Sequence, residues 1–83
     1  MALRVAITAA GSGIGLAVAR AFAALGDDVH LCDVDPAAVA AAAREGLTAQ
    51  TVDVADLAAL DAWIDGVLDA MGGLDVLVNN AGI

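Results

Sequence analysis

One stretch of the sequence decides the fold of this chain, Thr8-Ala9-Ala10-Gly11-Ser12-Gly13-Ile14-Gly15. Three glycines in eight residues are too many for a regular helix or strand, so the stretch predicts a turn. Residues 3–8 form a short apolar run typical of a buried parallel strand, and after the turn apolar residues recur with helical spacing. Such a turn places backbone N–H groups and the positive end of a helix dipole where a phosphate binds. We therefore expect a nucleotide-binding turn here.

Beyond this turn, strand and helix patterns continue to alternate. Short apolar runs predict three further strands at residues 29–33, 48–54 and 75–79. The two helical stretches between them begin at Asp35-Pro36 and at Asp56, as capped helices do. Gly26, Gly46 and Gly72 are expected to end the three helices.

This order of elements decides the expected topology. Strands that alternate with helices are joined by right-handed crossovers and form a parallel sheet. We predict an α/β fold with a parallel sheet of four strands in the spatial order 3-2-1-4. The fourth strand then has an open apolar edge, Val76-Leu77-Val78, which is an association hazard. We expect this edge to pair with a further part of the protein or with another copy.

Two helices carry apolar stripes that should pack on the sheet. The first stripe consists of Ile14, Ala17, Val18, Ala21, Phe22 and Leu25. The second consists of Leu57, Leu60, Ile64, Val67, Leu68 and Met71. Trp63 lies beside the second stripe, and we expect it to pack there rather than to stack on a ligand. Cys32 is expected to be a small buried residue with an unreactive thiol.

Composition and charge narrow the class of protein. With 83 residues, 61% of them hydrophobic, the chain is one small domain that should need a ligand, a partner or more polypeptide for stability. Its net charge of −8, with no lysine and three scattered arginines, argues against nucleic acid as a partner. A single cysteine excludes an internal disulfide, and no cluster of Cys and His suits zinc. Without a signal-peptide pattern or an apolar run of roughly 18 residues, we expect a cytoplasmic protein that does not bind membranes.

The spacing of the glycines identifies the class of the turn. A G-x-G-x-x-G fingerprint would require glycine at position 16 or 18, where the chain has Leu16 and Val18, and the Gly-Lys-Ser/Thr of a P-loop is absent. Residues 8–15 instead resemble the Thr-Gly-x-x-x-Gly-x-Gly turn of the short-chain dehydrogenase/reductase family. Asn79-Asn80-Ala81-Gly82 resembles that family's Asn-Asn-Ala-Gly motif, in the same order and about 65 residues later.

The resemblance implies a Rossmann-like three-layer half domain, with residues 1–83 as the N-terminal portion of a single NAD-binding Rossmann domain. One position departs from the family pattern, because the first glycine falls on Ala9. Alanine disfavours positive φ, so the turn must either accept a methyl group there or shift part of the glycine's role to Gly11.

The resemblance also implies which residues contact the cofactor. They are Gly11, Ser12, Gly13, Ile14, Gly15, Asp33, Asp53, Val54, Asn80 and Ala81. Gly13 would let the backbone approach the pyrophosphate, and Gly15 would let helix and strand pack closely. Ser12 and Ile14 would offer hydrogen-bond donors. Asn80 and Ala81 would border the adenosine side of the cleft.

Two acidic residues are expected to bind the adenosine part of the cofactor. Asp33 follows Gly15 by 18 residues, near the roughly 20-residue spacing at which an acid binds the ribose hydroxyls and repels a 2′-phosphate. Neither Ser12 nor Val34, where family members that prefer NADP carry a base, is basic. We therefore predict NAD rather than NADP. Asp53, with the valine after it, resembles the family's adenine-contacting pair, the alternative being that it only caps the next helix.

The implied activity is NAD-dependent oxidation of an alcohol or reduction of a carbonyl. In the resembling family, hydride transfer needs a Tyr and a Lys, assisted by a Ser and a further Asn. The chain has no Tyr and no Lys, and its one serine, Ser12, belongs to the turn, so we expect it to be inactive alone. Two alternatives stay open: a non-catalytic module that binds NAD or pairs through its fourth strand, and a methyltransferase-type nucleotide fold.

Overall fold

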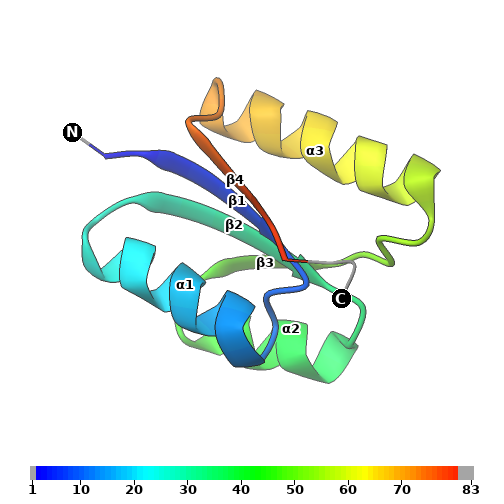
Figure 1. The fold of residues 1–83 in the computed structure, drawn as a ribbon, viewed down its shortest axis with the longest axis horizontal. Coiled ribbons are helices and arrows are strands. Elements are labelled where there is room, and N and C mark those ends of the chain that lie inside the picture. The colour runs from blue at the N-terminus through cyan, green and yellow to red at the C-terminus, as the bar shows by residue number, and fades with distance from the viewer. Residues whose placement is uncertain (1, 81–83) are drawn as a thin grey trace.

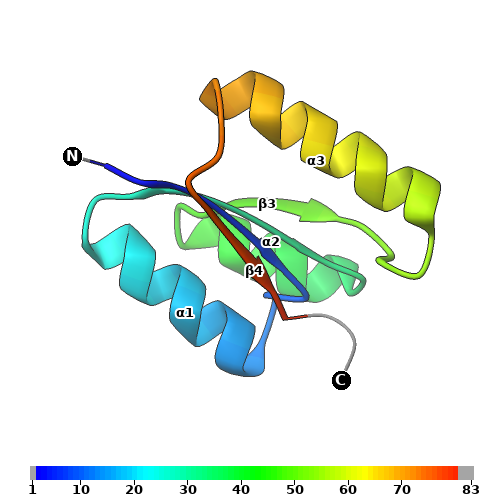
Figure 2. The ribbon, with the colours of Figure 1, turned by 45° about the horizontal axis from the view of Figure 1, so that its top comes forward.

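The computed structural model describes residues 2–80 and alternates strands with helices throughout. Its elements are β1 (Arg4–Thr8), α1 (Gly13–Ala24), β2 (Asp28–Asp33), α2 (Pro36–Arg44), β3 (Thr48–Thr51), α3 (Leu57–Met71) and β4 (Val76–Asn79). All strand pairs are parallel, in the order β3-β2-β1-β4. Helices α1 and α2 cover one face of the sheet and α3 covers the other (Figures 1 and 2). The predicted three-layer α/β topology is confirmed.

The sheet divides the apolar core into two clusters, because alternate residues of a strand point to opposite faces. On the α1 and α2 side, the buried residues are Val5, Ile7, Ala10, Ala19, Val29, Leu31 and Ala42. On the α3 side they are Ala6, Cys32, Val52, Trp63 and Val67. Within the described residues, no helix has the length and apolar character needed to cross a bilayer.

The helix faces that pack on the sheet agree with the predicted stripes in part, since Val18 and Phe22 of α1 and most of the α3 stripe contact the core. In α1 the buried residues are Gly15 and Ala19, whereas Ile14 and Leu25 are 75% and 79% exposed. In α3 Trp63 and Val67 are buried, whereas Leu57 is 71% exposed. Each helix meets the described sheet along a line narrower than its apolar arc, so the edges of that arc remain in contact with solvent.

The ends of the elements follow the sequence signals, with one exception. The carboxylates of Asp35 and Asp56 accept hydrogen bonds from backbone N–H groups in the first turns of α2 and α3, as predicted. Gly72 ends α3 in a left-handed conformation. The exception is β3, predicted over residues 48–54, which ends at Thr51 because the chain turns toward α3 through a hydrogen bond from the Asp56 N–H to the carbonyl of Asp53.

An ion pair joins the amino-terminal ends of β1 and β4. The guanidinium of Arg4 donates to both carboxylate oxygens of Asp75, at 3.0 and 3.1 Å, and to the carbonyl of Gly72. The backbone N–H of Arg4 also donates to Asp75, at 2.8 Å. These hydrogen bonds lower the pKa of the Asp75 carboxyl to about 2. The pair thereby fixes the position at which β4 begins beside β1.

Candidate functional site

The candidate site lies at the carboxyl ends of the parallel strands, where ligands of open α/β sheets bind. Thr8 at the end of β1 pairs with Asn79 at the end of β4, and the glycine turn leaves β1 directly after Thr8. Asp33 ends β2, on the other side of β1. The topology therefore brings the glycine turn, Asp33 and the Asn-Asn pair to one edge of the sheet, the lower right of the ribbon in Figure 1.

The turn accepts an alanine where the family pattern has its first glycine. Ala9 has a φ of +53°, and it is the one residue other than glycine with positive φ among residues 2–80. Hydrogen bonds on both sides hold it there. The N–H of Ala10 donates to the carbonyl of Cys32 at 2.9 Å, and Nδ2 of Asn80 donates to the carbonyl of Ala9 at 3.0 Å. Strained backbone persists where neighbouring contacts determine it in this way.

The amino end of α1 is open to an anion. Its N-cap residue, Ser12, makes no side-chain capping hydrogen bond, and no acidic residue lies in the first turn. The other two described helices are capped by the carboxylates of Asp35 and Asp56. Gly13 begins α1 with a φ of +60°, and a Cβ built on it would meet no atom within 4 Å. This end of α1 thus has no side-chain cap and has free space beside Gly13, both of which anion binding at a helix N-terminus requires.

Gly15 is where the turn requires close packing. A Cβ at this position would lie 2.6 Å from Nδ2 of Asn80, 2.8 Å from the carbonyl oxygen of Ala9 and 2.9 Å from Cα of Ala10. The first turn of α1, the end of β1 and Asn80 consequently meet without space for a side chain. Asn80 thus packs against the turn through its amide group.

Asp33 contacts the glycine turn directly. Its Oδ2 accepts a hydrogen bond from the N–H of Gly11 at 2.9 Å, and its Oδ1 accepts one from the N–H of Asp35, also at 2.9 Å. The carboxylate is half-buried, so part of it still faces solvent. The structure therefore brings together two sequence-predicted features that lie 22 residues apart.

The two asparagines make different contacts: the side chain of Asn79 bonds to β1, and that of Asn80 bonds to the turn. The hydroxyl of Thr8 donates to Oδ1 of Asn79 at 3.2 Å, so Asn79 links β4 to β1. The N–H of Asn80 donates to the same hydroxyl at 3.1 Å. Ala81, also predicted at the cofactor, lies outside the described residues. The sequence analysis did not predict that the Thr8 hydroxyl joins the ends of β1 and β4, although a threonine at the end of an apolar strand is a signal of such a hydrogen bond.

Asp53 and Val54 follow β3 and make their described contacts on the α3 side of the sheet. Oδ1 of Asp53 accepts the N–H of Ala55 at 2.9 Å, which forms a local turn ahead of α3. The side chain of Val54 packs on the cluster that contains Trp63. Both follow β3, the strand next to β2, and Asp53 is exposed at that edge.

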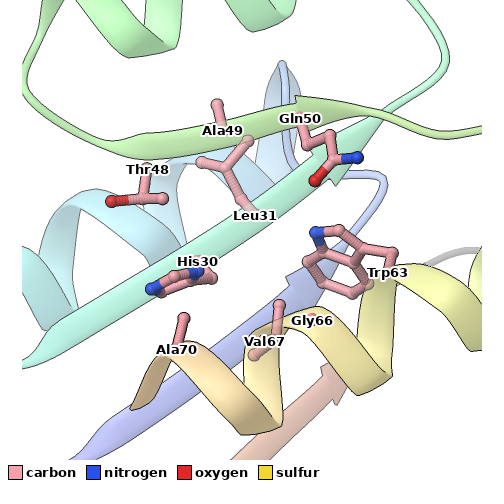
Figure 3. Close-up of a pocket in the computed structure, with 9 residues that line it drawn as sticks. All are labelled: His30, Leu31, Thr48, Ala49, Gln50, Trp63, Gly66, Val67 and Ala70. Atoms are coloured by element: carbon pink, nitrogen blue, oxygen red, sulfur yellow. The ribbon is translucent and has the colours of Figure 1, made fainter.

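A cavity lies away from this site. Its volume is about 230 Å³, and it opens between α3 and the face of β2 and β3 (Figure 3). Its lining includes His30 and Gln50 from the sheet and Trp63 from α3, and no residue of the glycine turn. The volume is below the roughly 300 Å³ at which ligand pockets begin. It is separate from the candidate site.

Cys32 and His30, the two remaining side chains with reactive groups, have structural surroundings that explain them without a ligand. Cys32 is fully buried, as predicted, and burial raises the pKa of its thiol, so the unreactive protonated form is favoured. His30 lies half-buried with Nε2 3.6 Å from a carboxylate oxygen of Asp28. Among residues 2–80, no three His, Cys, Asp or Glu side chains gather where they could hold a metal ion.

Comparisons with known proteins agree with this geometry. The family model for short chain dehydrogenases matches residues 4–83. Galactitol 2-dehydrogenase from Agrobacterium fabrum is 50% identical over 80 residues, which cover 93% of this chain and 31% of that protein. A putative ketoacyl reductase of the monensin polyketide synthase from Streptomyces virginiae is 48% identical over 82 residues, which cover 92% of this chain and 31% of that protein.

Solved structures show the same likeness in three dimensions. A 3-ketoacyl-(acyl-carrier-protein) reductase from Brucella melitensis, complexed with NADH, superposes with a TM-score of 0.86 at 39% identity, covering 95% of this chain and 34% of that one. An apo SCOR enzyme from Clostridium thermocellum superposes with a TM-score of 0.90 at 34% identity, covering 100% of this chain and 35% of that one. The chain spans about a third of the length of these relatives. With the glycine turn, the Asn-Asn pair and the sheet order in place, the chain belongs to the short-chain dehydrogenase/reductase family of oxidoreductases and forms its cofactor-binding Rossmann region.

Proposed function

We propose that residues 1–83 act as one unit that binds the adenosine diphosphate half of NAD, in preference to NADP, for an alcohol or carbonyl oxidoreductase. The observation that carries the proposal is the hydrogen bond of 2.9 Å from the Gly11 N–H to Asp33. It places a carboxylate beside the turn that leads into the uncapped amino end of α1. A diphosphate at the turn then has its ribose next to a group that accepts hydrogen bonds from both hydroxyls.

The residues present fit such a cofactor. The uncapped amino end of α1 supplies N–H donors and the positive end of a dipole, and the space beside Gly13 admits a ligand to the backbone. Asp33 keeps lone pairs on both oxygens, because each accepts one hydrogen bond within the protein. We propose that Ser12, Ile14 and Asn80 border the ligand as well.

The remaining predicted contacts belong to the same proposal. The exposed carboxylate of Asp53 would accept the exocyclic amine of adenine, and Val54 would border the base. The preference for NAD follows from charge. A 2′-phosphate would carry about −1.5 to −2 charges against the carboxylate of Asp33, and neither Ser12 nor Val34 offers a compensating cation.

Hydride transfer needs groups that this chain lacks. The bound nicotinamide supplies the hydride chemistry, whereas these residues bind and orient the cofactor. No tyrosine or lysine is present in the sequence, so we propose that proton transfer depends on residues outside these 83 and that the chain alone turns over no substrate. The outer strand β4, with Leu77 half exposed, would pair with a further strand of the protein or with another copy.

Calorimetry with NAD, NADP and S-adenosylmethionine tests the proposal. We expect NAD to bind more tightly than NADP and S-adenosylmethionine not to bind. The Asp33→Asn variant should lose about tenfold or more in NAD affinity, because it loses hydrogen bonds to a charged acceptor. Asp61→Asn, which removes the same charge from an exposed site on α3, is the matched control and should leave the affinity unchanged.

The outcomes separate the alternatives. Tighter binding of NADP would overturn the preference, and binding of S-adenosylmethionine alone would favour the methyltransferase alternative, which the family match already disfavours. Binding of NAD by the whole protein that carries this chain, without turnover of any alcohol or carbonyl substrate, would favour the non-catalytic module.

A further inference from the structure

Both oxygens of the Asp33 carboxylate are fixed by backbone donors from different segments. The N–H of Gly11, in the turn after β1, holds Oδ2, and the N–H of Asp35, at the start of α2, holds Oδ1. Each of these bonds is 2.9 Å long and has an ionised acceptor, which makes it stronger than a neutral hydrogen bond. Rotation of the carboxylate away from the site would break both bonds. The side chain is therefore held in one orientation before any ligand arrives.

The turn approaches Asp33 closely because residue 11 has no side chain. A Cβ built on Gly11 would lie 2.8 Å from Cβ and from Cγ of Asp33, and 2.8 Å from Cβ of Ala38 in α2. Cβ atoms of ordered proteins do not come this close, and two of the three atoms cannot move without their backbone. Gly11 itself is buried.

Space alone, and not backbone conformation, requires glycine at this position. Gly11 is absent from the residues of positive φ, whereas Ala9 is among them. The turn therefore has an alanine where conformation favours glycine and a glycine where only space demands it. Of the two alternatives that the sequence left open, the turn accepts the methyl group of Ala9, and Gly11 does not take over the first glycine's conformation. Ala9 keeps the left-handed conformation, and Gly11 admits Asp33.

We propose that Gly11 is a positioning residue for cofactor selection, because its missing side chain lets Asp33 dock on the turn and fixes the carboxylate against a phosphorylated ribose. This inference rests on the proposed binding of the adenosine ribose at Asp33. A carboxylate that is already oriented loses little conformational freedom when it binds the two hydroxyls, and it has no second orientation in which the repulsion of a 2′-phosphate is relieved. Discrimination between NAD and NADP then depends on the contact between Gly11 and Asp33 as well as on the negative charge of Asp33.

The test compares the dissociation constants of NAD and NADP in the whole protein that carries this chain, by calorimetry. In Gly11→Ala the added methyl group must displace the turn or α2, and we expect the ratio of the NADP constant to the NAD constant to fall by about tenfold. A variant that was only less stable would weaken both cofactors alike and leave the ratio unchanged. Gly66→Ala is the matched control, because a Cβ at this exposed position in α3 meets no atom within 4 Å.

A double-mutant cycle isolates the coupling between the two residues. In the Asp33→Asn background, Gly11→Ala should change the ratio by less than twofold, because no charge remains to be positioned. If the unmodified protein does not discriminate between the cofactors, the proposed function itself fails. If it does discriminate, Asp33→Asn abolishes the discrimination and Gly11→Ala leaves the ratio intact, then the inference about Gly11 is wrong and the proposed function stands.

Hydrogen exchange keeps the inference testable if Gly11→Ala does not fold. In the unmodified protein, the Gly11 amide should exchange slowly, and it should remain protected when NAD saturates the protein. Exchange of this amide at the rate of an open loop, or loss of its protection on NAD binding, would show that the carboxylate is not held by the turn and would overturn the inference.

Discussion

Replacing Ala9 by glycine should stabilise the protein. Ala9 has a φ of +53°, and the left-handed conformation costs an L-residue about 1–2 kcal/mol because Cβ approaches the following carbonyl. Glycine removes this strain, but it also raises the conformational entropy of the unfolded chain, which costs about 0.4–1 kcal/mol. The midpoints of the two ranges, about 1.5 and about 0.7 kcal/mol, predict a net gain of about 0.8 kcal/mol in the free energy of unfolding.

Urea unfolding of the variant and of a matched control measures this gain. Ala55→Gly makes the same chemical change at an exposed turn residue that does not have positive φ, so only the entropy effect applies and the variant should lose about 0.5–1 kcal/mol. Ala9→Val should be less stable than the parent protein, because a β-branched residue tolerates positive φ worst. If Ala9→Gly is destabilised as much as Ala55→Gly, the conclusion that Ala9 is strained is refuted.

Three further predictions concern packing, charge and reactivity. Gly15→Ala should lower the free energy of unfolding by about 1–3 kcal/mol, because its Cβ would lie 2.6 Å from Nδ2 of Asn80; a thermal melt that matches the parent's would contradict this. Arg4 lowers the pKa of Asp75 to about 2, so its contribution to stability is complete above the ordinary pKa of about 4 and is lost as pH falls toward 2. Acid titrations followed by circular dichroism should therefore show a shallower loss of stability over this range in Asp75→Asn than in the parent, and equal slopes would refute the assignment. Cys32 should react with a thiol reagent only after urea unfolds the protein, and rapid reaction of the native form would show that its burial is transient.

The topology was predictable because its signals are local. The caps at Asp35 and Asp56 and the glycine after α3 mark where helices begin and end, and alternation of strand and helix then restricts the sheet order. The faces of the helices were less predictable. Periodicity gives the centre of an apolar arc but not the line that meets the sheet, so Ile14 was placed in the packed stripe although it is exposed.

The candidate site was predictable in its parts but not in its contacts. The glycine turn and Asp33 follow from spacing, but the hydrogen bond between them depends on how closely β1, β2 and α2 approach one another. That approach is set by packing across the whole unit. For the same reason, the sequence alone could not tell whether Gly11 serves conformation or space.

The position of β1 in the sheet has a consequence for synthesis on the ribosome. β1 lies between β2 and β4, and Arg4 bonds to Asp75, 71 positions later. The first described strand to emerge is thus completed only when β4, the last described strand, pairs with its second edge. Contacts this distant in sequence form slowly, and until they do β1 in a nascent chain has one open edge.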